Sequence, residues 1–214
     1  MAQPAQPVTR SERTRRAVLE AAEKLFAERG FAATRLEDIA ERVGIKRASI
    51  VYYFKDKREL YEAVLDSVLG GLQRALIAEL SRHEDLAMRI EAAVSVWVDY
   101  VGSRPTLARL ILREVANATP EKRGRLLRHT APFQELVRKE FIDRPDRRDV
   151  VKVTVDPIHI ASIIAGATVF YVAAMPNLVP GPGFDPTSRE HIDDLKQELL
   201  RIVRQLLETR GTPA

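Results

Sequence analysis

Residues 36–54, LEDIAERVGIKRASIVYYF, decide the fold, because a small residue, a glycine and a branched aliphatic residue follow one another at separations of four and six positions. Ala40 is small enough for a second helix to cross closely over the first, and Gly44 can take the left-handed backbone that a tight turn needs. Three isoleucines would fill the core that the two helices share: Ile39, Ile45 and Ile50. The stretch therefore predicts a helix-turn-helix.

The second of these helices, from about Lys46 to Tyr53, carries polar and aromatic side chains on faces that the core does not need. Arg47 can form paired hydrogen bonds with a guanine edge or a phosphate, and Ser49 can bond to either. Lys57 lies in the first turn of the following helix, where its ammonium and the free backbone amides can jointly hold a phosphate. The candidate DNA-binding residues are Arg35, Lys46, Arg47, Ser49, Tyr52, Tyr53, Lys55 and Lys57.

The positive charge is concentrated in the same part of the chain. Residues 1–58 carry 13 Lys and Arg against 8 Asp and Glu, whereas the remainder of the 214 residues carries 21 against 22. This asymmetry is expected when one segment meets a polyanion and the rest does not, although a cluster of solvated charges would give the same count. The helix-turn-helix pattern favours the polyanion.

Capping patterns and apolar periodicity predict helices along the whole chain. Pairs with capping-box spacing open the first, second and fourth helices, and Gly30 predicts the end of the first. These pairs are Thr9 with Glu12, Thr34 with Glu37, and Asp56 with Glu59. Further helical patterns cover about 85–101, 104–117, 120–142, 157–175 and 187–209, with a Pro- and Gly-rich loop over 176–186. No segment alternates at period two, so the predicted fold is all-α.

The chain divides into an arm over residues 1–10, a helix-turn-helix domain over 11–58 and a helical domain over 59–214 that we expect to bind an effector and to dimerise. The start, Met1 to Val8, lacks the basic end and apolar core of a secretory signal, which predicts a cytoplasmic protein. The absence of cysteine excludes disulfides, thiolate metal sites and cysteine nucleophiles.

The N-terminal quarter closely resembles the tetracycline-repressor (TetR) family. The resemblance rests on Gly30-Phe31 through Thr34, Ile39-Ala40, Val43-Gly44-Ile45, the run Ser49–Lys57 and Leu60. It implies a ligand-responsive repressor that binds a palindromic DNA operator as a homodimer and releases it when a small molecule binds. It also implies that Lys46–Tyr53 is the recognition helix, that Tyr53 replaces a histidine that commonly touches phosphate, and that Lys57 is the family's phosphate-contacting lysine. Val51 departs from the pattern, because the family often has a phosphate-contacting tyrosine there.

Two C-terminal helices have the character of an interface. Ile160–Met175 has no charged residue over 16 positions, which is short of the ~20 residues that span a bilayer, so we expect a helix buried on all sides and no membrane partner. The final helix carries apolar residues at alternating separations of three and four. Intrachain packing would explain both patterns, whereas the resemblance implies a four-helix dimer interface. Its candidate residues are Ala161, Ala165, Ile192, Leu195, Leu199, Ile202 and Leu206.

An effector cavity would lie among the middle helices, where bulky and polar groups share apolar faces. Glu114 continues the apolar stripe of Leu107, Leu110 and Ile111, so it either caps a pocket or reaches solvent. His129 and His159 have no partner at metal-binding spacing, and no metal or cofactor is expected. The candidate pocket residues are Trp97, Tyr100, Leu110, Glu114, Phe133, His159 and Phe170.

Two other classes of protein compete with a ligand-responsive regulator. An enzyme is not expected, because the sequence has no phosphate-binding glycine loop, no nucleophile elbow and no HExxH motif. The other is a DNA-binding module that is regulated by a protein partner or by nothing, and whose C-terminal domain serves only for dimerisation. A closed apolar cavity between the middle helices would favour the ligand-responsive regulator, and a solid core would favour this alternative.

Overall fold

The computed structural model describes residues 9–116, 157–179 and 184–208, together with 131, 134–136, 138, 139 and 143. The predicted helix over 120–142 falls largely outside these residues, and so do His129 and Phe133. The chain forms two compact units, Met1–Ser67 and Val68–Ala214. The described residues form helices and no strand, which confirms the all-α prediction.

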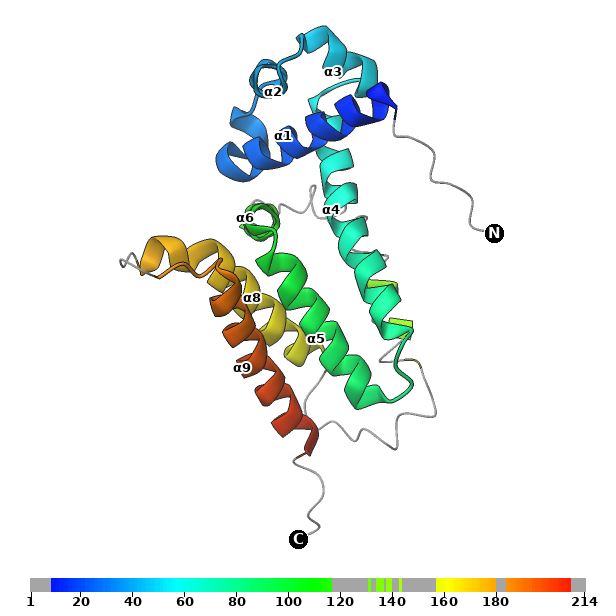
Figure 1. Cartoon of the computed structure of the whole chain (residues 1–214), viewed down its shortest axis with the longest axis vertical. Coiled ribbons are helices and arrows are strands. Elements are labelled where there is room, and N and C mark those ends of the chain that lie inside the picture. The colour runs from blue at the N-terminus through cyan, green and yellow to red at the C-terminus, as the bar shows by residue number, and fades with distance from the viewer. Residues whose placement is uncertain are drawn as a thin grey trace. The chain divides into compact units, whose positions relative to one another are not determined.

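The N-terminal unit contains three helices and the beginning of a fourth (Figure 1). They are α1 (Arg10–Ala33), α2 (Leu36–Val43), α3 (Arg47–Tyr53) and α4 (Lys57–Leu80). The sequence-based domain boundary after residue 58 falls in the first turn of α4. Apolar side chains from all four helices meet in one core, and the largest fully buried ones are Val18, Phe26, Ile39, Ile50, Phe54, Leu60 and Val64.

Helix α1 begins and bends where the sequence predicts. Thr9 and Glu12 form a complete capping box, in which the Thr9 hydroxyl accepts from the Glu12 amide at 3.1 Å and the Glu12 carboxylate accepts from the Thr9 amide at 2.7 Å. The bond from the Thr9 amide, and a second that the carboxylate accepts from the Thr9 hydroxyl at 2.9 Å, lower the pKa of Glu12. Gly30 has φ 80°, a left-handed conformation that favours glycine, and it interrupts the helix before the last turn.

The predicted Thr34–Glu37 capping box is wrong by one residue. Helix α2 is preceded by Arg35, whose amide donates to the Asp38 carboxylate at 3.2 Å. Thr34 is fully buried, and its hydroxyl lies 2.8 Å from the Gly30 carbonyl and 3.2 Å from the Leu25 carbonyl. Thr34 therefore satisfies the carbonyl end of α1 and does not open α2.

The turn between α2 and α3 satisfies the last carbonyls of α2 through its own backbone. Gly44 has φ 73° and ψ 35°, its amide donates to the Glu41 carbonyl at 3.0 Å, and the Ile45 amide donates to the Ala40 carbonyl at 3.0 Å. These are the two bonds of a Schellman motif, which needs the left-handed residue that glycine supplies without strain. The turn confirms the predicted role of Gly44.

Asp56 caps α4, as the spacing predicts. Its carboxylate accepts from the Glu59 amide at 2.9 Å, while the Glu59 carboxylate accepts from the Lys55 amide at 2.8 Å. The reciprocal bond therefore reaches one residue further back than in a standard capping box. The two bonds fix the path of the chain between α3 and α4.

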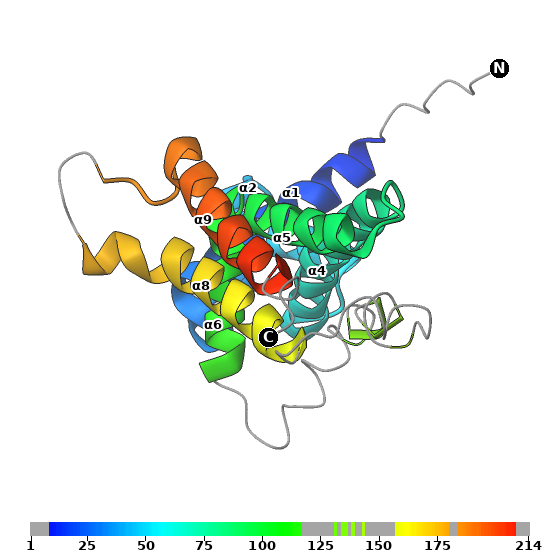
Figure 2. The same ribbon diagram turned by 90° about the horizontal axis from the view of Figure 1, so that it is seen from below.

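Four helices of the C-terminal unit are α5 (Leu86–Gly102), α6 (Pro105–Ala116), α8 (Pro157–Leu178) and α9 (Arg189–Glu208). Figure 2 shows α9 lying beside α5 and α8, and α6 also packs on α8. Gly102 of α5 admits the Ile192 side chain of α9 at close range. Lys196 of α9 donates to the Asp99 carboxylate of α5 at 2.7 Å. One face of α5 is thus committed to α9.

Helix α8 extends further than predicted and is not buried on all sides within one chain. It continues through Pro176 to Leu178, so the predicted loop begins too early. Ile164, Thr168 and Val172 are buried, whereas Ile163 and Phe170 are 52% and 49% exposed. The stretch His159–Leu178 is long and apolar enough to cross a membrane by length and composition, a test that core helices of soluble proteins also pass.

Replacing Thr34 by valine should destabilise the N-terminal unit. The change keeps the shape but removes the hydroxyl between two carbonyls in a fully buried position. The free energy of unfolding, measured by urea denaturation, is expected to fall by about 1–2 kcal/mol. Thr14→Val is the matched control, because the half-buried Thr14 hydroxyl bonds to one carbonyl only, that of Arg10, at 3.0 Å. Equal losses in both variants would contradict the role assigned to Thr34.

Candidate nucleic-acid interface

The outer edge of α3 presents most of the side chains that the sequence assigned to DNA binding. Lys46 precedes the helix and is exposed, Ser49 is half-buried, and Tyr52 is 82% exposed. Ile50 on the opposite side is fully buried between the helices. The helix therefore offers one edge to solvent while its inner face is fixed by the core.

Tyr53 is held in place from two sides. Its ring packs edge-on against Tyr52 with 5.1 Å between centroids, and its hydroxyl oxygen accepts from the Ser11 hydroxyl at 3.3 Å. Ser11 lies in the first turn of α1, so this contact joins the beginning of α1 to the end of α3. The hydroxyl of Tyr53 is positioned before any partner arrives.

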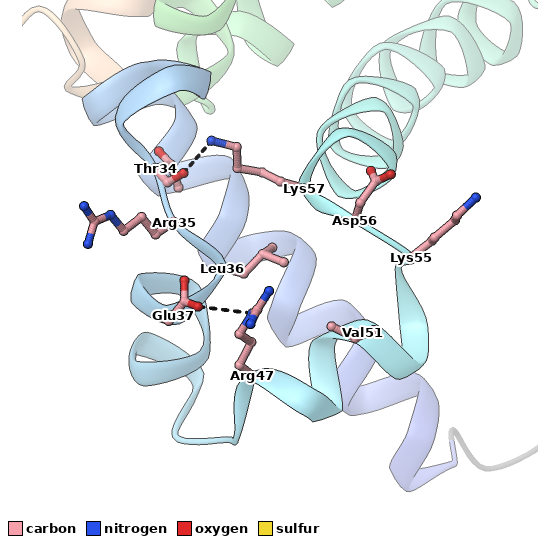
Figure 3. A pocket seen from close by; sticks show the side chains of 9 residues that line it. All are labelled: Thr34, Arg35, Leu36, Glu37, Arg47, Val51, Lys55, Asp56 and Lys57. Carbon is pink, nitrogen blue, oxygen red and sulfur yellow. Dashed lines mark hydrogen bonds and ion pairs between the residues drawn. The ribbon is translucent and has the colours of Figure 1, made fainter.

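A shallow, open depression of about 430 Å³ lies beside α3, between the beginnings of α2 and α4 (Figure 3). Four cationic and two anionic side chains belong to its wall, so its net charge is positive. It gathers four of the eight predicted DNA-binding residues: Arg35, Arg47, Lys55 and Lys57. The remaining lining residues are Thr34, Leu36, Glu37, Val51 and Asp56.

Arg47 is oriented across this depression by an acidic partner that the sequence analysis missed. Its Nε lies 3.1 Å from a carboxylate oxygen of Glu37 on α2, and both side chains are about 60% exposed. An exposed ion pair of this kind contributes little to stability, about 0–1 kcal/mol, so its main effect is to restrict where the guanidinium points. The two residues lie on different helices, and no local spacing rule connects them.

Lys57 has partners other than the phosphate that was predicted for it. Its ammonium lies 2.8 Å from the carbonyls of Phe31 and Thr34 and 3.3 Å from that of Ala32, and 4.5 Å from the centre of the Phe31 ring. Phe31 and Ala32 belong to the last turn of α1 and Thr34 follows it, so Lys57 ties the beginning of α4 to the end of α1. The structure thus gives it a role in shaping the depression.

The comparisons with known proteins agree with this geometry. Residues 18–64 match the sequence family described as bacterial regulatory proteins, tetR family. The chain is 32% identical over 126 residues to the HTH-type transcriptional regulator TtgR of Pseudomonas putida, a match that covers 58% of this chain and 54% of that protein. The chain therefore spans about half the length of this relative.

The helix-turn-helix segment, residues 18–64, is thus that of the TetR family. FadR from Bacillus halodurans, a fatty acid degradation regulator, has a similar fold with a TM-score of 0.71 and 14% identity over 99% of this chain and 100% of its own. AibR, solved in complex with isovaleryl coenzyme A and operator DNA, also has a similar fold. Its TM-score is 0.66 and its sequence identity 18%, over 88% of this chain and 97% of its own. The matched family and the named relative are transcriptional regulators, which agrees with the DNA-binding domain predicted for the N-terminal segment.

The candidate effector residues do not share one environment. Trp97, Tyr100 and Glu114 are half-buried, and Leu110 is buried in the core. His159 and Phe170 are exposed on α8, so we remove both from the candidate pocket, because a pocket wall faces inward. Phe133 lies outside the described residues.

The candidate dimer-interface residues also differ from one another in burial. Ile192 and Leu199 are buried against their own chain, which accounts for part of the heptad-like pattern on α9. The others leave surface uncovered in the single chain: Ala161 and Ile202 are exposed, while Ala165, Leu195 and Leu206 are half-buried. Intrachain packing therefore explains some of these residues but not all.

Lys57→Ala should destabilise the N-terminal unit even without DNA. Three carbonyls lose a cationic donor, and hydrogen bonds to charged groups contribute more than neutral ones. Because Lys57 is half-buried, we expect a loss of about 1–2 kcal/mol in the free energy of unfolding, measured by urea denaturation. Lys55→Ala removes an exposed lysine from the same depression and should leave stability within about 0.5 kcal/mol. A variant at Lys57 as stable as one at Lys55 would rule out this role.

Proposed function

We propose that this protein is a ligand-responsive repressor that binds duplex DNA as a dimer. The observation that carries the proposal is the solvent-facing edge of α3 beside a cation-lined depression. A helix of this width fits the major groove, and cations beside it meet the phosphates that flank the groove. The AibR relative, whose complex contains operator DNA, supports the same use of the fold.

The side chains divide into those that read bases and those that hold the backbone. Arg47 and Tyr52 extend from α3 itself, where a guanidinium can pair with guanine and an aromatic ring can contact a thymine methyl group. Arg35 and Lys55 lie at the edges of the depression and are exposed, so they are placed to neutralise phosphates. Lys57 stabilises this surface through its hydrogen bonds to the carbonyls of Phe31 and Thr34.

A second copy of the chain supplies the other half of the DNA site. A helix-turn-helix of this size reads one half-site, and a two-fold dimer places two recognition helices on a palindromic operator. The exposed face of α8, formed by Ile163, Gly166 and Phe170 at helical spacing, is apolar and unpartnered in the single chain. Together with Ile202 of α9 it is the surface that the partner copy would cover.

Release of the operator follows from linkage. The dimer has one state whose recognition helices fit DNA and one in which they are misplaced. A small molecule that binds the misplaced state more tightly lowers the affinity for DNA, by at most the ratio of its affinities for the two states. Helix α4 is the natural lever, because it is one continuous helix that begins in the N-terminal unit and ends in the C-terminal unit. The AibR relative was solved with isovaleryl coenzyme A, which supports a small-molecule effector as a general mode for this fold.

Selection of bound DNA from random sequence by the purified protein tests the proposal directly. The expected result is a palindromic consensus, bound most tightly at low ionic strength and released by at least one compound from a metabolite collection. Failure to bind any duplex at low salt would refute the function. Binding without release by any compound would favour a regulator whose C-terminal unit only dimerises.

Arg47→Ala and Lys55→Ala should weaken DNA binding in different ways. Loss of Arg47 removes a base contact, so discrimination between the consensus and a site altered at one base pair should fall by about 1–3 kcal/mol. Loss of Lys55 should weaken consensus and random DNA alike and reduce the salt slope by about one. Fluorescence anisotropy at several salt concentrations measures both quantities. Identical effects of the two variants on both DNAs would contradict the division into readers and anchors.

Phe170→Glu should dissociate the dimer. A carboxylate on the apolar face of α8 would be buried without a partner in the interface, at a cost of several kcal/mol. Analytical ultracentrifugation is expected to show a monomer for this variant and a dimer for the parent. Met88→Glu is the matched control, because Met88 is 55% exposed on α5, away from the proposed face. A Phe170 variant that stays dimeric would move the interface elsewhere.

A further inference from the structure

Helix α5 has a second functional face, opposite the one that packs on α9. Asp99 and Gly102 meet α9, whereas Trp97 and Tyr100 lie on the other side of the helix, one turn apart. Arg104 follows at the next helical interval, just after α5 ends. These three side chains carry hydrogen-bond donors, and none of them is a carboxylate.

The Tyr100 hydroxyl is bonded to the backbone of α4. It donates to the Val68 carbonyl at 2.9 Å and accepts from the Arg104 guanidinium at 2.8 Å. The guanidinium also lies 5.5 Å from the centre of the Tyr100 ring. A carbonyl inside a helix already accepts a hydrogen bond from an amide of its own helix. The Val68 carbonyl therefore keeps one hydrogen bond if the Tyr100 hydroxyl leaves it.

Gly71 makes room for this contact. A Cβ atom at position 71 would collide with the Tyr100 hydroxyl oxygen, whereas a Cβ at the neighbouring Gly70 would meet only the end of the Arg74 side chain at 3.4 Å. Glycine within a helix costs about 0.5–1 kcal/mol relative to alanine. At position 71 that cost has a structural reason, because only glycine lets the Tyr100 hydroxyl reach the Val68 carbonyl of α4.

The indole N–H of Trp97 is a further hydrogen-bond donor on this face of α5. Its Nε1 is buried and has no hydrogen-bond partner among the residues that the structure describes. A buried indole N–H without an acceptor is costly, because its bond to water is lost and nothing replaces it. A ligand that brings an acceptor to this position would recover that loss.

We propose that Trp97, Tyr100 and Arg104 form the polar end of the effector site, and that the site takes a carboxylate or a similar acceptor-rich anion. The inference rests on the proposed function and specifies its ligand. The anion accepts from the Trp97 indole and competes with the Val68 carbonyl for the Tyr100 hydroxyl. Binding of the ligand therefore removes a bond that holds α4, the helix that continues into the N-terminal unit.

The chain has a single tryptophan, so one indole signal in the nitrogen-15 NMR spectrum of the full-length protein reports on this site. The probes are cyclohexanecarboxylate and cyclohexylmethylammonium, which share size and shape but have opposite charge and hydrogen-bonding character. The carboxylate should shift the indole proton downfield in a saturable manner, whereas the ammonium should not. No saturable shift with the carboxylate, or equal shifts with both probes, would overturn the proposal.

Two variants distinguish a ligand donor from a structural tyrosine. Tyr100→Phe removes the hydroxyl and should weaken carboxylate binding about fivefold or more. Gly71→Ala displaces the hydroxyl from Val68, so it should strengthen carboxylate binding about two- to fivefold by removing the competition. Gly70→Ala changes the same helix without touching Tyr100 and should match the parent. If Tyr100→Phe and Gly71→Ala change the affinity for the carboxylate in the same direction, or do not change it, the proposed competition is refuted.

The same probe also separates this proposal from the proposed function. In the parent protein, saturating cyclohexanecarboxylate should weaken binding to the selected operator at least about fivefold. A protein that binds the probe at Trp97 but binds no duplex would retain the anion site and refute the repressor. A protein whose operator is released by other compounds but never by the carboxylate would retain the repressor and refute the anion site as its effector site.

Discussion

The contact on which the candidate DNA-binding surface depends is that of the Lys57 ammonium with three main-chain carbonyls. It joins the beginning of α4 to the end of α1, and the Thr34 hydroxyl donates to a carbonyl of the same helix end. Carbonyls at a helix end carry partial negative charge, so a cation there is stabilised by the dipole as well as by hydrogen bonds. The depression beside α3 keeps its shape because this corner is closed from within.

The fold of the N-terminal unit could be predicted because its determinants are local. Gly44 must be left-handed, and the isoleucines at 39 and 50 must face inward, whatever the rest of the chain does. The misplaced capping box shows where local rules stop. Thr34–Glu37 and Arg35–Asp38 have the same spacing, and only the three-dimensional path shows that the Thr34 hydroxyl is used by α1. The partners of Lys57 and Arg47 are distant in sequence, so spacing could not identify them.

In the C-terminal unit the periodic pattern identified apolar faces but not what covers them. Ile192 and Leu199 pack on their own chain, while Ile202 on the same helix and Phe170 on α8 remain at the surface. One stripe on α9 therefore contains residues of two kinds: those buried within the chain, and those at its surface that a second copy would cover in the proposed dimer. Composition alone could not separate them, and the burial of each residue does.

Helix α5 has two faces that differ in how easily their contacts can be exchanged. The face toward α9 combines the close approach of Ile192 to Gly102 with the Lys196–Asp99 ion pair, in which the pKa of Lys196 is raised by its two carboxylate partners despite burial. Those contacts are lost if the helices separate. The face toward α4 instead depends on a hydroxyl that any strong acceptor can take, and an unsatisfied indole lies one turn away. In the proposed site, a ligand that accepts from the Tyr100 hydroxyl would therefore break its bond to α4 while the contacts between α5 and α9 stay in place.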